Sequence, residues 1–180
     1  MRPRLPERVT GLLVRDGRPV GLDVPSLDER GCAPAWKAAL GKGPFLVRFA
    51  DRAREAPLAQ VQRLALVGEV WLDAPVHDVD AALELLIAGA ARLVVWDHAG
   101  ELLQAMGDSA VVGWDGVVPL ADAVAAAKPH MAPVVALAPA ADTSDPGLYQ
   151  APPRPWSGPF EVLHVGPVGD EADAGDAEDE

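Results

Sequence analysis

Short apolar islands rich in Val, Leu and Trp recur along the chain, and polar or Ala-rich segments separate them. Seven islands have the length and composition of β-strands. They cover Val9 to Val14, Phe45 to Phe49, Glu69 to Leu72, Arg92 to Trp96, Ala110 to Trp114, Pro133 to Ala138 and Phe160 to His164. From the second island onward, the starts lie 24, 23, 18, 23 and 27 residues apart, which leaves room for one helix between consecutive strands.

Amphipathic segments lie between most of these islands. The clearest one has apolar residues at the helical positions i, i+3, i+4, i+7 and i+8, which are Val79, Ala82, Leu83, Leu86 and Ile87. This spacing predicts one buried face of a helix, with Asp78 as its N-terminal cap and Gly89 at its end. Shorter stripes predict three further helices, over 58–65, 102–106 and 120–127.

The alternation of strands and helices predicts parallel strands joined by crossover helices, so the fold class is α/β. A closed eight-stranded βα barrel usually needs about 200 to 250 residues, whereas this chain has 180. We therefore expect a short or incomplete TIM-type βα barrel, with an open parallel α/β sheet as the alternative. The predicted organisation is an N-terminal arm (1–8), one barrel-like domain (9–169) with a proline-rich loop (138–159), and a disordered acidic tail (170–180).

The net charge of −12 is concentrated at the C-terminus. Seven of the 27 acidic residues stand among the last eleven positions, without a base, so the rest of the chain has 20 acids against 15 Lys and Arg. Binding to phosphate backbones and anionic lipid depends on Lys and Arg. The sequence therefore argues against a nucleic-acid or membrane partner.

The remaining composition favours a cytoplasmic protein without a cofactor. The single Cys32 cannot form an internal disulfide, and no Cys/His spacing resembles a zinc site. The charged N-terminus is not followed by an apolar region, and no stretch is apolar enough to span a membrane. No glycine-rich loop that would cradle a phosphate is present, apart from a weak remnant at 166–169.

Aspartates follow several of the predicted strands. They are Asp51, Asp73, Asp97, Asp115 and, after the sixth strand, Asp142. The C-terminal ends of parallel strands form the ligand-binding face of such folds, so these carboxylates should gather at one edge. There they would act as general acids or bases, or would ligate a metal together with His98. The alternative, for Asp51 and Asp73 above all, is that each one caps the next helix.

Three tryptophans also stand at predicted strand ends: Trp71, Trp96 and Trp114. They either line a ligand pocket or fill the layer between the strands and their neighbours. Covalent catalysis has little support, because Ser109 and Ser144 lack a nucleophile-elbow pattern and Cys32 has no partner nearby in the sequence.

The segment from Val70 to Val95, VWLDAPVHDVDAALELLIAGAARLVV, resembles the third strand, helix and fourth strand of ProFAR isomerase, the βα barrel of the histidine pathway. Other pieces resemble this family in the same order. Residues 9–17 resemble its first strand with an Asp-Gly hairpin, 47–53 the second strand, 111–116 the fifth and 133–147 the sixth. The resemblance covers most of residues 9–147 and is most specific around the third and fourth strands.

The resemblance implies two catalytic aspartates, at the ends of strands one and five, for an Amadori rearrangement of an aminoaldose to an aminoketose. The strand-five position is Asp115, but the strand-one position is Leu13, which cannot transfer a proton. Asp16 is a nearby substitute. The glycine-rich phosphate loop of the family is replaced by Asp73 to His77, where a carboxylate would repel phosphate. The original isomerase activity is therefore expected to be lost.

The segment VWLDAPVHDV is similar to the sequences of a diverged branch of this family that occurs alongside tetrahydromethanopterin-linked one-carbon metabolism. That branch supplies a metabolic context and not a reaction. The first hypothesis is a barrel protein that binds a small metabolite at the strand C-termini, and whether it is an enzyme stays open. The predicted catalytic residues are Asp115 and Asp16, and the predicted ligand-binding residues are Asp51, Asp73, Asp97, His98 and Trp114. The second hypothesis is a catalytically inactive scaffold that binds a protein partner or a second copy of itself.

Overall fold

The computed structural model of the chain describes residues 8–41, 43–50, 56–76, 78–96, 100–114, 119–130, 132, 134–136 and 162–167. Within these ranges strands and helices alternate. In chain order the elements are β1 (Arg8–Arg15), β2 (Arg18–Pro19), α1 (Ala33–Leu40), β3 (Phe45–Phe49), α2 (Leu58–Val67), β4 (Val70–Asp73), α3 (Val79–Ile87), β5 (Arg92–Val95), α4 (Gly100–Met106), a 3-10 turn (Gly107–Ser109), β6 (Ala110–Trp114), α5 (Leu120–Ala127), a 3-10 turn (Lys128–His130), β7 (Val134–Ala136) and β8 (Val162–Pro167).

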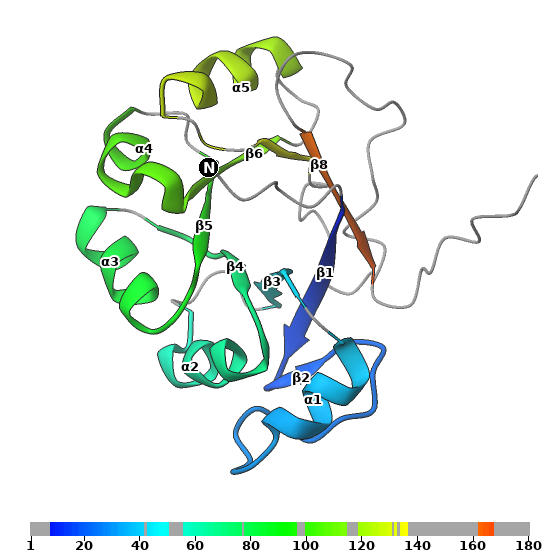
Figure 1. Cartoon of the computed structure of the whole chain (residues 1–180). Coiled ribbons are helices and arrows are strands. Elements are labelled where there is room, and N and C mark those ends of the chain that lie inside the picture. Colours follow the sequence, from blue (N-terminus) through cyan, green and yellow to red (C-terminus); the bar gives the residue numbers. More distant parts are fainter. Residues whose placement is uncertain are drawn as a thin grey trace, which may run out of the picture.

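All of these strands belong to one sheet, in the order β2-β1-β3-β4-β5-β6-β7-β8. Only β2 runs antiparallel to its neighbour in the described pairings, and the other pairs are parallel. The last strand, β8, pairs with β7 and also with β1. Figure 1 shows helices α1 to α5 following one another around the outside of the strands. The predicted α/β class with a mostly parallel sheet is therefore confirmed.

Strands β3 and β4 are buried at every residue, and β5 and β6 at every residue but one each. Because consecutive residues of a strand point to opposite sides, both faces of these four strands are covered. One hydrophobic cluster lies on the helix-covered side and includes Leu12, Val47 and Leu72 together with Leu64 and Leu103 of the helices. A smaller cluster lies on the opposite side, which we call the inner face. It consists of Val9, Leu13, Leu46, Trp71, Val94 and Val111. Burial on both faces accounts for the continuous apolar islands in the sequence.

Helix α3 has the bounds that the sequence predicts, but its predicted buried face is wrong in part: Leu83 and Ile87 are 46% and 85% exposed, and the helix buries Ala82 and Leu85. The side chain of Asp78 accepts a hydrogen bond from the backbone N–H of Ala81 at 2.8 Å, and Gly89 follows the last turn with a φ of +113°. The sequence did not predict β2 or α1. The second of these has Trp36 as its one buried residue, so it carries no apolar stripe that a periodicity argument can detect.

Several predicted features lie outside the described residues. They are the arm up to residue 7, the proline-rich loop at 138–159 and the acidic tail at 170–180. Among the helices that are described, none combines the length and the apolar character needed to cross a membrane.

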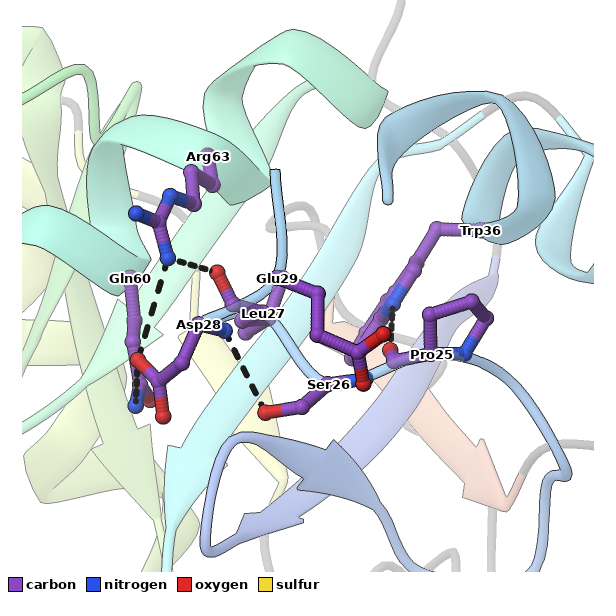
Figure 2. Close-up of polar contacts among 8 residues, drawn as sticks. All are labelled: Pro25, Ser26, Leu27, Asp28, Glu29, Trp36, Gln60 and Arg63. Atoms are coloured by element: carbon purple, nitrogen blue, oxygen red, sulfur yellow. Dashed lines mark hydrogen bonds and ion pairs between the residues drawn. The ribbon is translucent and has the colours of Figure 1, made fainter. Parts of the chain in front are cut away.

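The loop between β2 and α1 is fixed by polar contacts to both of its neighbours. Figure 2 shows Arg63 of α2 reaching the carbonyl of Leu27 and the carboxylate of Asp28, which also accepts a hydrogen bond from Gln60 at 3.1 Å. Two residues before Leu27, the carbonyl of Pro25 accepts a hydrogen bond from the indole N–H of Trp36 at 2.8 Å. The first strand hairpin is thereby tied to helices α1 and α2.

The hairpin turn after β1 rests directly on this loop. Gly17 has a φ of +73°, its carbonyl accepts a hydrogen bond from the Leu27 N–H at 2.7 Å, and a Cβ atom built on it would lie 2.5 Å from the Ser26 hydroxyl oxygen. Such a contact is shorter than real Cβ contacts, so the Ser26 hydroxyl, the end of a flexible side chain, would have to move. The positive φ is therefore the main reason why the turn needs glycine.

We expect Gly17→Ala to lower the free energy of unfolding by about 1.5–3.5 kcal/mol. Left-handed backbone costs a non-glycine residue about 1–2 kcal/mol, and moving the Ser26 hydroxyl, which accepts a hydrogen bond from the Asp28 N–H, adds about 0.5–1.5 kcal/mol. Gly21→Ala is the matched control, because Gly21 has a φ of +88° but nothing within 4 Å of its Cβ position. Urea unfolding of both variants separates the cost of the left-handed backbone from the cost of the contact with Ser26. Equal losses in the two variants would contradict that contact.

Candidate functional site

A charged pair lies on the otherwise apolar inner face, near the C-terminal ends of β3 and β4. Arg48 is the fourth residue of β3, Asp73 is the last residue of β4, and the two are partners in the parallel register. Leu13 of β1 is the register partner of Arg48 on the other side. The three side chains therefore stand at one level of the sheet.

Arg48 and Asp73 form a fully buried ion pair. The Nε atom of Arg48 donates to Oδ2 of Asp73 at 2.7 Å, and Nη2 lies 2.6 Å from the same oxygen. Neither side chain has any solvent-exposed surface. The indole N–H of Trp96, the residue after β5, donates to the other carboxylate oxygen, Oδ1, at 2.7 Å. Asp73 thus holds two side chains, from β3 and from the end of β5, in fixed positions.

Partly exposed apolar residues border the inner cluster. Val20, Ala50 and Trp96 pack against it, and they follow β2, β3 and β5 respectively. The backbone N–H groups of Val20 and Ala50 donate to the carbonyls of Leu13 and Val14, both at 2.8 Å, so this rim is hydrogen-bonded to β1. Ala50 and Trp96 therefore add apolar surface at the C-terminal ends of β3 and β5.

A tryptophan fills the N-terminal part of the inner face. Trp71 is fully buried, and its indole N–H donates to Glu69 at 2.7 Å. The guanidinium carbon of Arg92 lies 5.3 Å from the centroid of a Trp71 ring, which is a cation–π distance, and Arg92 also donates to the carbonyl of Asp108. Trp71 therefore occupies this part of the inner face, with Glu69 and Arg92 against its ring.

A cavity of about 540 Å³ lies near the N-terminal end of β3. Its lining consists of Lys37, Gly41, Gly43, Val67, Gly68 and Glu69. The two charged residues are exposed. Ligands of parallel α/β folds bind at the opposite, C-terminal ends of the strands. We therefore place the candidate site at Arg48, Asp73 and Trp96 and not in this cavity.

Three of the predicted site residues lie within the described ranges, and each has a different environment. Asp73 is buried on the inner face and lies inside β4 instead of capping the next helix, a role that Asp78 takes. Asp16 is exposed in the turn between β1 and β2, with a φ of +50°. Trp114 is partly buried and packs against the helix-side cluster, whereas Trp96 packs against the inner cluster.

The other predicted site residues lie outside the described part of the chain: Asp51, Asp97, His98, Asp115 and Asp142. Their catalytic and ligand-binding roles stay predictions. Within the described ranges, no group of three or more His, Cys, Asp or Glu side chains is placed to hold a metal ion. That finding does not test the predicted metal set, because Asp73 is its single described member.

The sequence prediction missed Arg48. The residue is a charge inside an island of five residues that is otherwise apolar, FLVRF, and such a charge is expected only with a partner. This signal was available, but the identity of the partner was not, because it depends on the register between β3 and β4. Trp96 was considered as a pocket-lining residue, but its hydrogen bond to Asp73 was not foreseen.

Neither a protein-family model nor a curated protein matches this chain. The candidate site is therefore defined by its geometry.

Proposed function

We propose that this chain is a diverged ProFAR-isomerase-like barrel protein that binds a small metabolite at the C-terminal ends of its strands. The observation that carries the proposal is the buried Arg48–Asp73 pair, with Trp96, on the inner face. The apolar residues around the pair would pack without it.

A buried ion pair contributes little net free energy to the stability of a core. Desolvation of the two charges often outweighs their attraction, so that well-packed apolar residues of similar volume are equally or more stabilising. Both Arg48 and Asp73 are fully buried, and both oxygens of Asp73 accept hydrogen bonds. The position of the pair near the ligand-binding edge of a parallel sheet supports a role in shaping a site there.

The pairing of β8 with both β7 and β1 supports a short closed barrel over an open sheet. The surroundings of Leu13 support loss of the parent isomerase reaction. Leu13 is buried on the inner face, beside Arg48 in the register, and offers no group that transfers a proton. Asp16 stands in the exposed turn beyond β1, at the same edge of the sheet.

In this proposal Asp115 is the acid–base residue, and the ligand belongs to tetrahydromethanopterin-linked one-carbon metabolism. Both points rest on the sequence resemblance. A specific observation also favours the alternative of a partner-binding scaffold: α2 and α3 expose Leu66 and Ile87, at 64% and 85% of their surface.

Ligand binding is tested by thermal shift of the purified chain against sugar phosphates, pterins and furan derivatives. A ligand at 100 times its Kd stabilises the folded state by about 2.7 kcal/mol. We expect a rise in Tm with at least one member of the panel and loss of that rise in Asp115→Asn. Asp122→Asn, a change of an exposed residue in α5, is the matched control and should keep the response.

Two outcomes would contradict this proposal. The first is that no member of the panel raises the Tm and that light scattering shows the chain in a stoichiometric complex. This result would support the scaffold alternative. The second is a response that Asp115→Asn leaves unchanged, which would remove Asp115 from the site.

A further inference from the structure

The exposed large apolar side chains are concentrated on two neighbouring helices. In the described part of the chain, all of them belong to α2 or α3: Leu58, Leu66, Leu83 and Ile87. The two helices follow one another on the outside of the sheet (Figure 1), and a Cβ atom built on Gly89, just after α3, would lie 2.6 Å from the Cβ atom of Ala65 in α2. Single exposed apolar residues are normal, but a concentration of them marks an interaction surface. We call the outer surface that these four residues share the α2–α3 face.

Acidic side chains border the apolar residues of α3. Asp80 and Glu84 are exposed and stand four residues apart, as do Leu83 and Ile87. Residues at this spacing are neighbours on a helix surface, so an acidic row and an apolar row run side by side along α3. The helix contains no Lys or Arg, and neither carboxylate has an ion-pair partner among the residues that the structure describes.

The single charged residue of α2 is already engaged elsewhere. Arg63 donates to the carbonyl of Leu27, and its Nη1 atom lies 3.8 Å from Oδ1 of Asp28, so it is tied to the loop before α1. Figure 2 shows the Arg63 guanidinium directed at these two residues. The charge that the α2–α3 face offers to a partner is therefore negative.

We propose that the α2–α3 face binds a protein partner through an amphipathic helix whose apolar stripe is bordered by Lys or Arg. The inference is independent of metabolite binding, because this face lies on the outside of the sheet. Helix faces present side chains and no free strand edge, so strand addition is excluded here, whereas rows of side chains four residues apart fit between the rows of a second helix.

Charge selects a basic partner over a second copy of the chain. Asp80 and Glu84 would pair with the flanking cations of the incoming helix, and the net charge of −12 attracts a basic segment over a longer distance. A second copy would bring the same acidic row and the same net charge to the contact. Like charges across an interface oppose association.

The test measures binding of fluorescent synthetic peptides to the full chain by anisotropy. One probe is a helical peptide of Leu, Ala and Lys with Leu at positions i, i+3, i+4 and i+7, and the other has Glu in place of Lys. We expect saturable binding of the Lys peptide and none of the Glu peptide. Ile87→Ser changes a mostly exposed residue, so the variant should fold, and it should weaken binding about ten- to one-hundredfold, the usual contribution of a buried aliphatic side chain. Gln104→Ser, at an exposed position of α4, is the matched control and should keep the affinity.

Glu84→Gln tests the acidic row separately. It should weaken binding of the Lys peptide by about two- to fivefold, the range of one exposed ion pair, whereas Asp122→Asn in α5 should have no effect. Equal binding of the two peptides, or binding of the Lys peptide that Ile87→Ser leaves unchanged, would overturn the proposal. A dimer of the free chain in sedimentation, or binding to phosphatidylcholine vesicles, would also overturn it if Ile87→Ser abolished that association, and would assign the face to a second copy or to a lipid surface.

Discussion

Replacing Arg48 by methionine is expected to lower the free energy of unfolding by about 3–5 kcal/mol, because it leaves the Asp73 carboxylate buried without its cation. Asp73→Leu should cost a similar amount for the converse reason. The double variant Arg48→Met/Asp73→Leu removes both charges and should be more stable than either single variant. Urea unfolding of the four proteins forms a double-mutant cycle, whose interaction free energy measures the coupling directly.

The control for this cycle is the exposed pair of Arg18 and Glu29, whose charged atoms lie 3.5 Å apart with more than half of each side chain in solvent. Exposed pairs contribute about 0–1 kcal/mol, so Arg18→Met should have little effect. If the loss in the double variant equals the sum of the losses in the two single variants, the two side chains act separately, and this result would contradict the ion pair.

Truncation of Trp71 to alanine is expected to cost about 3–5 kcal/mol, the usual range for a large aromatic residue in a core. The side chain has no exposed surface and occupies the N-terminal part of the inner face, between Glu69 and Arg92. The buried members of the inner cluster around Trp71 all belong to strands, so none of them is a helix residue that could move into the cavity left by alanine. Thermal and urea unfolding measure the loss.

Trp71→Phe separates packing from the polar contacts. It keeps most of the apolar volume but removes the hydrogen bond to Glu69 and weakens the cation–π contact with Arg92, so we expect a loss of about 1–2 kcal/mol. Leu66→Ala is the control for large-to-small truncation, since Leu66 is mostly exposed. Equal losses in Trp71→Ala and Leu66→Ala would contradict the packed interior described above.

The elements that sequence predicted best are those whose pattern is local. The seven apolar islands coincide with strands, and α3 has its predicted bounds because Asp78 caps it, although Leu85 and not Ile87 lies on its buried face. Helix α1 escaped detection, since Trp36 alone anchors it, and β2 has only two residues. Neither element has the repeated apolar positions from which periodicity predicts a helix or a strand.

The candidate site was predictable in its location but not in its contacts. The aspartate at the end of β4 directed the prediction to the edge of the sheet where the candidate site is placed, yet its partner Arg48 stands 25 residues earlier in the chain. Their meeting depends on the alignment of β3 with β4, which no local pattern encodes. The same limit explains why Trp96 and Trp114 looked equivalent in the sequence, although they pack on opposite faces.

The Arg48–Asp73 pair also has a consequence for which strand alignments the chain can adopt. Apolar residues occupy both faces of β3 and β4, so hydrophobic burial discriminates only weakly between the observed register and one shifted by a single residue. A shift would turn the Asp73 carboxylate toward the helix-side cluster, away from the guanidinium, and would leave both charges buried and apart. The pair therefore favours the observed strand register, because it destabilises misregistered forms far more than it stabilises the native one.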